Sequence, residues 1–206
     1  MNSAPASAAM QRGEDLPGSS RRPPAGRREW ETMSIRTLQA YALILSGITT
    51  LVWLVGPDTP LFNAILIIST ILFIIGIPAA YTSQPLGTPG LVGIILVVLA
   101  AVIALGFQSL DLNLSPALEG LLFWTSVIAG TVGRLIVGWL TTRRGVFPAW
   151  VGVAFMIEGL LFIGGSFDLG SFANVYNTLV ILVGVAAVLG YGFYLLRAPR
   201  AAAALS

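Results

Sequence analysis

The chain has 206 residues, of which 56% are hydrophobic and only 10% are charged. Soluble domains carry about 25% charged residues, so this composition excludes an ordinary soluble globular domain. The chain also lacks cysteine and histidine, and its net charge is +2. These absences exclude thiol and imidazole catalysis and the usual zinc, haem and copper sites. We therefore expect no enzyme, no catalytic residue, no cofactor, no metal and no nucleic-acid partner, and take the lipid bilayer as the main partner.

The first residues differ from the rest of the chain. Residues 1–32 are rich in Ala, Ser, Pro, Gly and Arg and have no periodic apolar face. Such a composition buries too little apolar surface to offset the entropy of ordering, and it predicts a disordered cytoplasmic tail over residues 1–36. The tail could bind anionic lipids through its arginines. Alternatively, it is a dispensable or mis-assigned extension, which the composition favours, because Met33 leads straight into the first apolar span.

Six apolar segments follow, each long enough to cross a hydrocarbon core of about 30 Å as a helix. Turn-forming residues separate them, for example over residues 56–60 and 84–90. Pro78 should kink or end the second span, because proline lacks a backbone N–H and clashes with the preceding turn. We predict an all-α domain, a six-transmembrane-helix bundle over residues 37–196, followed by a short tail over 197–206. The predicted spans are 37–55, 61–81, 91–108, 117–140, 148–165 and 174–196.

Arginines are distributed unevenly about these spans. If the N-terminus lies inside, the inner flanks carry nine arginines and the three outer loops carry none. The outer loops instead carry Asp58, Asp111 and Asp168. This bias predicts that both termini are cytoplasmic, and the arginine- and alanine-rich composition suggests the inner membrane of a bacterium. The nine arginines are Arg21, Arg22, Arg27, Arg28, Arg36, Arg143, Arg144, Arg197 and Arg200.

The outer loops resemble one another. Residues 109–112 match residues 166–169, and Thr59, Ser115 and Ser171 are candidate N-caps of the helices that follow these loops. The chain can therefore be interpreted as three serial helical hairpins. Alternatively, every short outer turn selects a small residue, an acid and a cap, which explains most of the match.

Small residues recur at four-residue spacing within the spans. Ser126 and Gly130 form one such stripe, and Ala186 and Gly190 form another. Stripes of this kind let helix backbones approach closely. They fit contacts inside the bundle best, and they could alternatively serve a homo-oligomer or a membrane-protein partner.

Two charged residues lie inside predicted spans. Arg134 lies about 9 Å from the inner end of the fourth span, and Glu158 lies about 15 Å into the fifth, near the midplane. A charged residue at a helix centre costs about 2.5–3.5 kcal/mol on insertion. A short inner loop joins the two spans, so they should be antiparallel neighbours. A two-point Arg134–Glu158 pair would satisfy both charges.

Three interpretations of this pair remain. It can be a structural ion pair that fixes the register of two helices, which we favour because such a pair is self-contained. Arg134 can instead extend to the inner interface and leave Glu158 protonated. In the third interpretation, Glu158 faces a cavity and exchanges a proton or binds a cation, as intramembrane carboxylates of transporters do. Whether Glu158 borders a wet cavity distinguishes the third interpretation from the first.

A weaker polar signal lies near the outer ends of the second and sixth spans. Asn63, Asn174, Tyr176 and Asn177 could line an outward-facing polar pocket there. Helix ends that face water commonly carry such residues, so the pattern is weak.

Residues 76–81 (Gly-Ile-Pro-Ala-Ala-Tyr) and 90–93 (Gly-Leu-Val-Gly) resemble a group of small six-span bacterial membrane proteins without assigned activity. The three-hairpin plan is also similar to acid-resistance membrane proteins built from hairpin repeats. The likeness covers residues 37–196 in architecture only and implies no catalytic residue. We therefore expect a non-enzymatic structural, stress-related or assembly protein or, alternatively, a small transporter or channel that uses Glu158.

Overall fold

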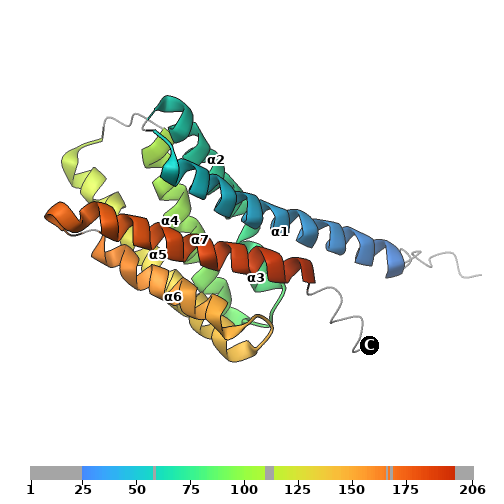
Figure 1. Cartoon of the computed structure of the whole chain (residues 1–206). Helices are drawn as coiled ribbons and strands as arrows, with labels where there is room; N and C mark the ends of the chain where they lie inside the picture. The colour runs from blue at the N-terminus through green and yellow to red at the C-terminus, as the bar shows by residue number, and fades with distance from the viewer. Residues whose placement is uncertain (1–24, 58, 110–113, 166, 168, 198–206) are drawn as a thin grey trace, which may run out of the picture.

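The computed structural model describes residues 25–57, 59–109, 114–165, 167 and 169–197, and these are almost entirely helical (Figure 1). Five of the helices are long and apolar enough to cross a membrane. The helices are α1 (Ala25–Val55), α2 (Pro60–Gly76), α3 (Pro78–Thr82), α4 (Gly87–Ser109), α5 (Pro116–Arg144), α6 (Ala149–Gly164) and α7 (Ala173–Arg197), with a 3₁₀ turn, η1 (Gly170–Phe172), before α7.

Helix α6 is too short to count as a sixth full-length span. It has 16 residues, or about 24 Å, against a hydrocarbon core of about 30 Å. Pro148 occupies its N-cap position. At the other end the carbonyl of Leu161 accepts hydrogen bonds from the Gly165 N–H at 3.1 Å and from the Tyr176 hydroxyl at 2.6 Å, which completes the last turn. A helix is present at the predicted span over residues 148–165, but a count of six membrane-spanning helices is not confirmed.

The second predicted span is divided as Pro78 predicts. Helix α2 ends at Gly76 and the short helix α3 begins at Pro78. Because proline has no N–H to donate, the α-helical ladder cannot continue unchanged through this residue. The remaining predicted helices agree with the structure to within a few residues at most ends.

Helix α1 is the exception, because it begins at Ala25 and not at residue 37. Its first turns extend past the other helices (Figure 1). Three arginines and two glutamates lie between Ala25 and Arg36, and both residue types favour helix. The prediction of a disordered tail to residue 36 was therefore wrong for this part, because its composition was averaged with the Pro- and Gly-rich residues before it. Residues 1–24 and 198–206 lie outside the described part of the chain.

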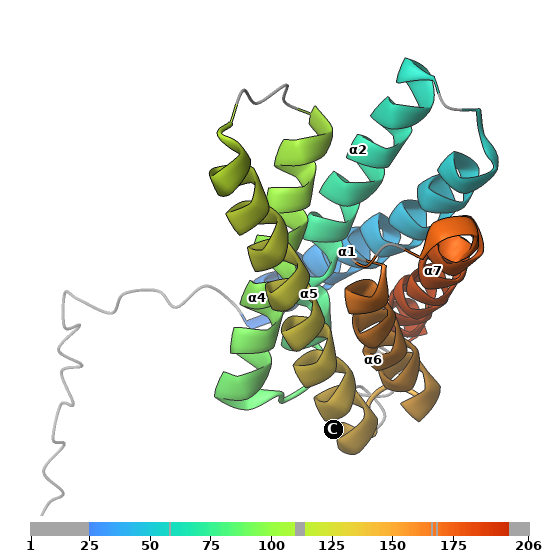
Figure 2. The ribbon, with the colours of Figure 1, turned by 90° about the vertical axis from the view of Figure 1, so that its left-hand side faces the viewer.

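The six main helices, which are α1, α2, α4, α5, α6 and α7, form a closed ring. Each of the pairs α1–α2, α4–α5 and α6–α7 packs together, as three hairpins would. Helices α5 and α6 pack just as extensively, and α1 packs along α7, which closes the ring (Figure 2). The contact between α2 and α4 is the smallest in the ring. The architecture is thus one ring of helices, within which three serial hairpins can still be traced.

The predicted N-caps have different outcomes. Ser115 caps α5, because its hydroxyl accepts a hydrogen bond from the Leu118 N–H at 3.4 Å. Thr59 precedes α2 without a side-chain cap bond. Ser171 does not cap α7, because it lies inside η1 and α7 begins two residues later. The matching loop segments 109–112 and 166–169 lie mostly outside the described residues, so the repeat stays a prediction.

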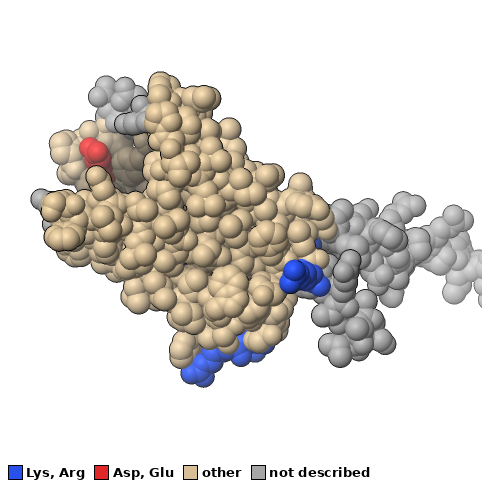
Figure 3. All heavy atoms as spheres, viewed as in Figure 1, with Lys and Arg blue, Asp and Glu red and all other residues tan. Residues whose placement is uncertain are grey.

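Most arginines of the described chain lie at one end of the ring, which we call the arginine-rich end (Figure 3). Arg36, directly before the predicted first span, donates to the carbonyl of Thr82, the last residue of α3. Arg143 and Arg144 end α5, and Arg197 ends α7. The visible acidic side chain lies toward the opposite end, beside a hollow (Figure 3).

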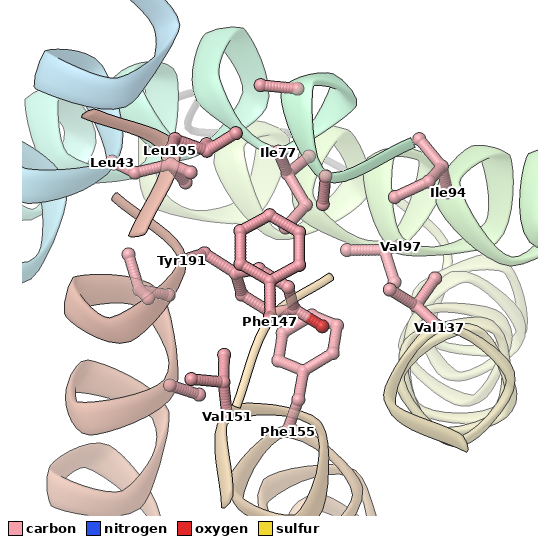
Figure 4. Packing of buried hydrophobic residues seen from close by; sticks show 14 of the residues in the cluster. Leu43, Ile77, Ile94, Val97, Val137, Phe147, Val151, Phe155, Tyr191 and Leu195 are labelled. Atoms are coloured by element: carbon pink, nitrogen blue, oxygen red, sulfur yellow. The ribbon is translucent and has the colours of Figure 1, made fainter. Parts of the chain in front are cut away.

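The buried core lies in the half of the bundle nearest the arginine-rich end. There Tyr191 lies between Phe147 and Phe155, with edge-to-face ring centroids 5.3 and 5.5 Å away (Figure 4). Leu43 and Val137 belong to the same cluster. Toward the opposite end the helices diverge (Figure 2). The bundle is therefore closed at one end and looser at the other.

Candidate functional site

Arg134 on α5 and Glu158 on α6 are brought together by the structure. The Arg134 Nε lies 3.0 Å from the Glu158 Oε1, and the two side chains are only 13% and 12% exposed. Arg134 is about 15 Å along α5 from Arg144, and Glu158 is about 14 Å along α6 from Ala149. Their depths agree better than the sequence suggests, because α5 continues past residue 140 to Arg144.

The ion pair does not close on itself. The Arg134 N–H at Nε lacks the geometry of a hydrogen bond, and the second carboxylate oxygen, Oε2 of Glu158, has no hydrogen-bond partner. The 3.0 Å separation is therefore an ionic contact and not a well-aligned hydrogen bond. The predicted two-point pairing was wrong. It failed because the Nε edge of the guanidinium contacts only Oε1 of Glu158, so Oε2 remains without a partner.

Glycines leave room for the two charged side chains. A Cβ atom at Gly159 would lie 2.9 Å from the Cβ of Arg134, and a Cβ at Gly184 on α7 would lie 2.9 Å from the Glu158 carboxylate. A Cβ at these positions would force a shift, so both glycines keep space at the pair. The Glu158 carboxylate therefore rests directly on the backbone of α7.

Aromatic rings hold the guanidinium of Arg134. Its Cζ lies 5.0 Å from the ring centroid of Phe162 and 5.9 Å from that of Phe155. A cation over an aromatic face within about 6 Å is attracted by the ring quadrupole. The rings therefore stabilise the charge of Arg134 without using its hydrogen-bond donors.

The pair borders a central cavity of about 230 Å³. All six main helices contribute to its wall, so the cavity occupies the middle of the ring. Its surface is mainly apolar, with the ion pair and several hydroxyl groups as the polar part. The lining residues are Ser46, Gly47, Thr50, Leu66, Ser69, Thr70, Phe73, Ala100, Ala101, Ala104, Arg134, Glu158, Phe162, Val180, Ile181, Gly184, Val185 and Val188.

Hydroxyl groups of α1 and α2 form a polar cluster on the cavity wall. The Ser69 hydroxyl donates to the Ser46 carbonyl at 2.8 Å, and it lies 2.6 Å from the Thr50 hydroxyl. Next to it, the Thr70 hydroxyl contacts Gln108 Oε1 at 3.2 Å across the α2–α4 seam. Gln108 is exposed, so this polar wall reaches from the cavity to the surface.

The cavity is closed toward the arginine-rich end by buried side chains. Gln84 Nε2 donates to the Thr141 hydroxyl at 2.9 Å, and that hydroxyl lies 2.9 Å from the Tyr191 hydroxyl. All three residues are buried, and they sit among the apolar core residues. These contacts join the segment after α3 to α5 and α7, and they make the narrow end of the bundle.

Sequence analysis missed these polar positions. Ser46, Ser69 and Thr141 were not singled out, because isolated hydroxyl residues are common in membrane helices and bond back to their own helix. A usable signal was present, because polar residues recur near the middle of the first two spans. At that depth polar side chains indicate a face that packs on another helix and not on lipid. Which face they occupy follows only from packing.

The predicted outer pocket is not the cavity that the structure contains. Asn63, Asn174 and Asn177 are exposed, and none of them lines the cavity. Tyr176 is half-buried and uses its hydroxyl on the Leu161 carbonyl of α6. These residues lie at helix ends, above the level at which the six helices converge.

The small-residue stripes mostly face the inside of the same bundle. Ser126 donates to the Ala100 carbonyl of α4 at 3.2 Å, and Gly130 and Gly190 are buried. Only Ala186 of the four stripe residues is exposed. Contacts within one chain therefore account for three of the four residues, and a homo-oligomer or a membrane-protein partner at these stripes stays a prediction.

Comparison with known proteins identifies no relative: no family model, no curated protein and no solved structure matches the chain. Function must therefore be argued from the cavity itself. In the described part of the chain, no group of three or more Asp, Glu, His or Cys side chains could hold a metal ion. The site offers instead one guanidinium, one carboxylate and several hydroxyls.

Proposed function

We propose that the protein is a small membrane transporter that binds a solute in its central cavity through Arg134 and Glu158. The observation that carries this proposal is that Glu158, whose buried Oε2 has no hydrogen-bond partner, lines a cavity that all six helices build. Buried polar groups are normally satisfied, so an intramembrane carboxylate that is left half-satisfied beside a cavity is suited to a ligand.

A purely structural ion pair is the competing interpretation, and sequence alone favours it. A structural pair would bury both charges against each other and fill its surroundings with side chains. Here the pair packs closely on Gly159 and Gly184, but a cavity adjoins it. An unfilled cavity costs packing energy, and it supports a binding role over a structural one.

The proposed location is the cytoplasmic membrane of a bacterium, with both termini on the cytoplasmic side. Five apolar helices of sufficient length are compatible with an integral membrane protein. The arginine-rich end then faces the cytoplasm, since positively charged flanks stay inside. The cavity consequently opens toward the periplasm, and the narrow end faces the cytoplasm.

Thiol labelling tests whether the cavity admits water and solutes. The chain contains no cysteine, so single cysteines can be read without background. Ala104 lines the cavity, whereas Val102 on the same helix is 49% exposed on the outer surface of the bundle. We expect Ala104→Cys, in membrane vesicles, to react with 2-aminoethyl methanethiosulfonate added from the periplasmic face. Val102→Cys should stay inert, because its thiol lies in lipid.

In a closed bundle both cysteines would stay inert, whereas an accessible cavity makes only Ala104→Cys reactive. If Ala104→Cys is inert from both faces in a protein that melts normally, the cavity admits no solute and the transport proposal fails. The structural interpretation of the ion pair would then stand.

A further inference from the structure

We infer that the solute is a small monovalent anion, which binds Arg134 while Glu158 takes up one proton. The inference rests on the proposed function and adds the chemical class of the ligand. It follows from the juxtaposition of one guanidinium and one half-satisfied carboxylate at the wall of a single small cavity.

Charge balance is the first argument. The empty site holds Arg134 and Glu158 with opposite charges, so its net charge is zero. A net charge away from water is costly. A bound cation would leave the site with a net charge of one, whereas an anion together with a proton on Glu158 keeps it neutral. Neutrality in both states therefore favours an anion that enters with a proton.

The geometry of Arg134 is the second argument. A guanidinium carries five N–H donors in a planar fork, and its contact with Glu158 runs through Nε alone. Planar forks bind carboxylates and similar oxyanions at two points. Phe162 holds the guanidinium through its ring face. Arg134 can therefore exchange its contact with Glu158 for an anion without leaving its place.

The proton goes to the Glu158 carboxylate, and it is taken up from the bulk solution together with the anion, so no hydroxide is left in the cavity. Arg134 on α5 and Tyr191 on α7 are the charged or titratable groups that face Glu158 from the described helices. The hydroxyl of Tyr191 is held by Thr141. Helices α1, α2 and α4 present hydroxyl and apolar side chains to the cavity. No second carboxylate lines it, which leaves Glu158 as the acceptor.

The size of the cavity limits the anion. Its volume of about 230 Å³ is below the roughly 300–1,000 Å³ of pockets for drug-sized ligands. Acetate has the right charge and a planar carboxylate. Acetamide has the same shape without the charge, and methylammonium is a cation of similar size. These three probes separate the classes of solute.

Binding with a proton count tests the inference. Purified protein in detergent would be titrated with each probe between pH 6 and 8 in weak buffer containing a pH indicator. We expect acetate to bind with uptake of about one proton per anion. Its affinity should then weaken by up to about tenfold for each unit by which the pH rises, as one linked proton requires. Acetamide and methylammonium should not bind measurably.

Two substitutions and two matched controls assign the roles. Glu158→Gln carries an uncharged side chain of the same shape, so it should bind acetate without proton uptake and equally at pH 6 and pH 8. Arg134→Gln should lose at least tenfold in affinity. Glu119→Gln and Arg143→Gln make the same charge changes at exposed positions and should behave like the wild type. If Glu158→Gln fails to fold, the number of protons that the wild type takes up with acetate still tests the inference.

The outcomes separate the inference from the proposed function. Methylammonium binding with proton release would overturn the anion class but keep a solute site at Glu158. If Ala104→Cys reacts and no probe binds, the cavity is accessible and the anion inference is wrong. If Ala104→Cys is inert, the proposed function itself fails.

Discussion

Arg134 and Glu158 show how two charges are accommodated among apolar helices. Each side chain is about nine-tenths buried, and the aromatic rings and glycine backbones around them replace water only in part. Removing one partner of a buried pair leaves the other uncompensated, which typically costs about 3–5 kcal/mol. Arg134 contacts Glu158 through Nε, and Oε2 of Glu158 has no partner. Loss of Arg134 and loss of Glu158 should therefore lower the free energy of unfolding by different amounts.

We predict coupling in a double-mutant cycle of Arg134→Leu and Glu158→Gln. Each single substitution should lower the free energy of unfolding, and the double substitution should cost less than their sum, with a coupling of about 0.5–3 kcal/mol. Arg134→Leu should be the milder change, because a lone carboxylate can take up a proton, whereas a lone guanidinium stays charged. Reversible unfolding in detergent would measure the cycle, and additive effects would exclude a stabilising contact.

At the scale of the helices, close approach is achieved by glycine pairs. Helices α5 and α6 meet at Gly138 and Gly152, where a Cβ on Gly138 would lie 2.5 Å from the Gly152 carbonyl oxygen. The short helix α6 is therefore held along α5 by backbone contact and by the bond from the Thr131 hydroxyl to the Gly159 carbonyl at 3.0 Å. Such contacts let a helix of 16 residues keep its place.

We predict that Gly152→Ala destabilises the protein by about 1–3 kcal/mol, because the added methyl group forces α5 and α6 apart. Gly120→Ala is the matched control on α5, where nothing lies within 4 Å of the added atom. It should be neutral or stabilising by up to about 1 kcal/mol, since alanine favours helix. Thermal melting in detergent would compare the two variants. Equal effects would argue against the close α5–α6 crossing.

The whole molecule is asymmetric along the direction of its helices. Its buried core and most of its described arginines lie at one end, and the helices diverge toward the other. In the proposed transporter, a solute reaches the cavity from the end at which the helices diverge. The orientation of the chain therefore decides from which compartment the cavity is reached.

We predict that reporter fusions after Asp58, Asp111 and Asp168 are periplasmic, and that fusions after Arg143 and Arg200 are cytoplasmic. The arginine bias supplies the reason. The fusion after Asp168 is the most informative of the five, because its location shows whether the 16-residue helix α6 crosses the membrane. A cytoplasmic signal there would mean that α6 turns back within the bilayer, and a periplasmic signal after Arg143 would invert the whole topology.

The sequence by itself determined the helices and most of their ends, because hydropathy, proline and capping act over a few neighbouring residues. Pro78 ended α2 and Ser115 capped α5 as predicted. The sequence also placed Arg134 beside Glu158, since a short loop between adjacent spans leaves few other arrangements. It failed at Ala25, where weak helix propensity was outweighed by the composition of the preceding residues.

Only the tertiary structure decided that the ring closes and that a cavity remains inside it. Closure depends on α1 meeting α7, and no local pattern encodes a contact between the two ends of the chain. The face that Ser46 and Ser69 present depends on the rotation of each helix against its neighbours. The free oxygen of Glu158 likewise depends on side-chain geometry, because a few tenths of an ångström and the angle of one N–H separate a closed ion pair from an open one.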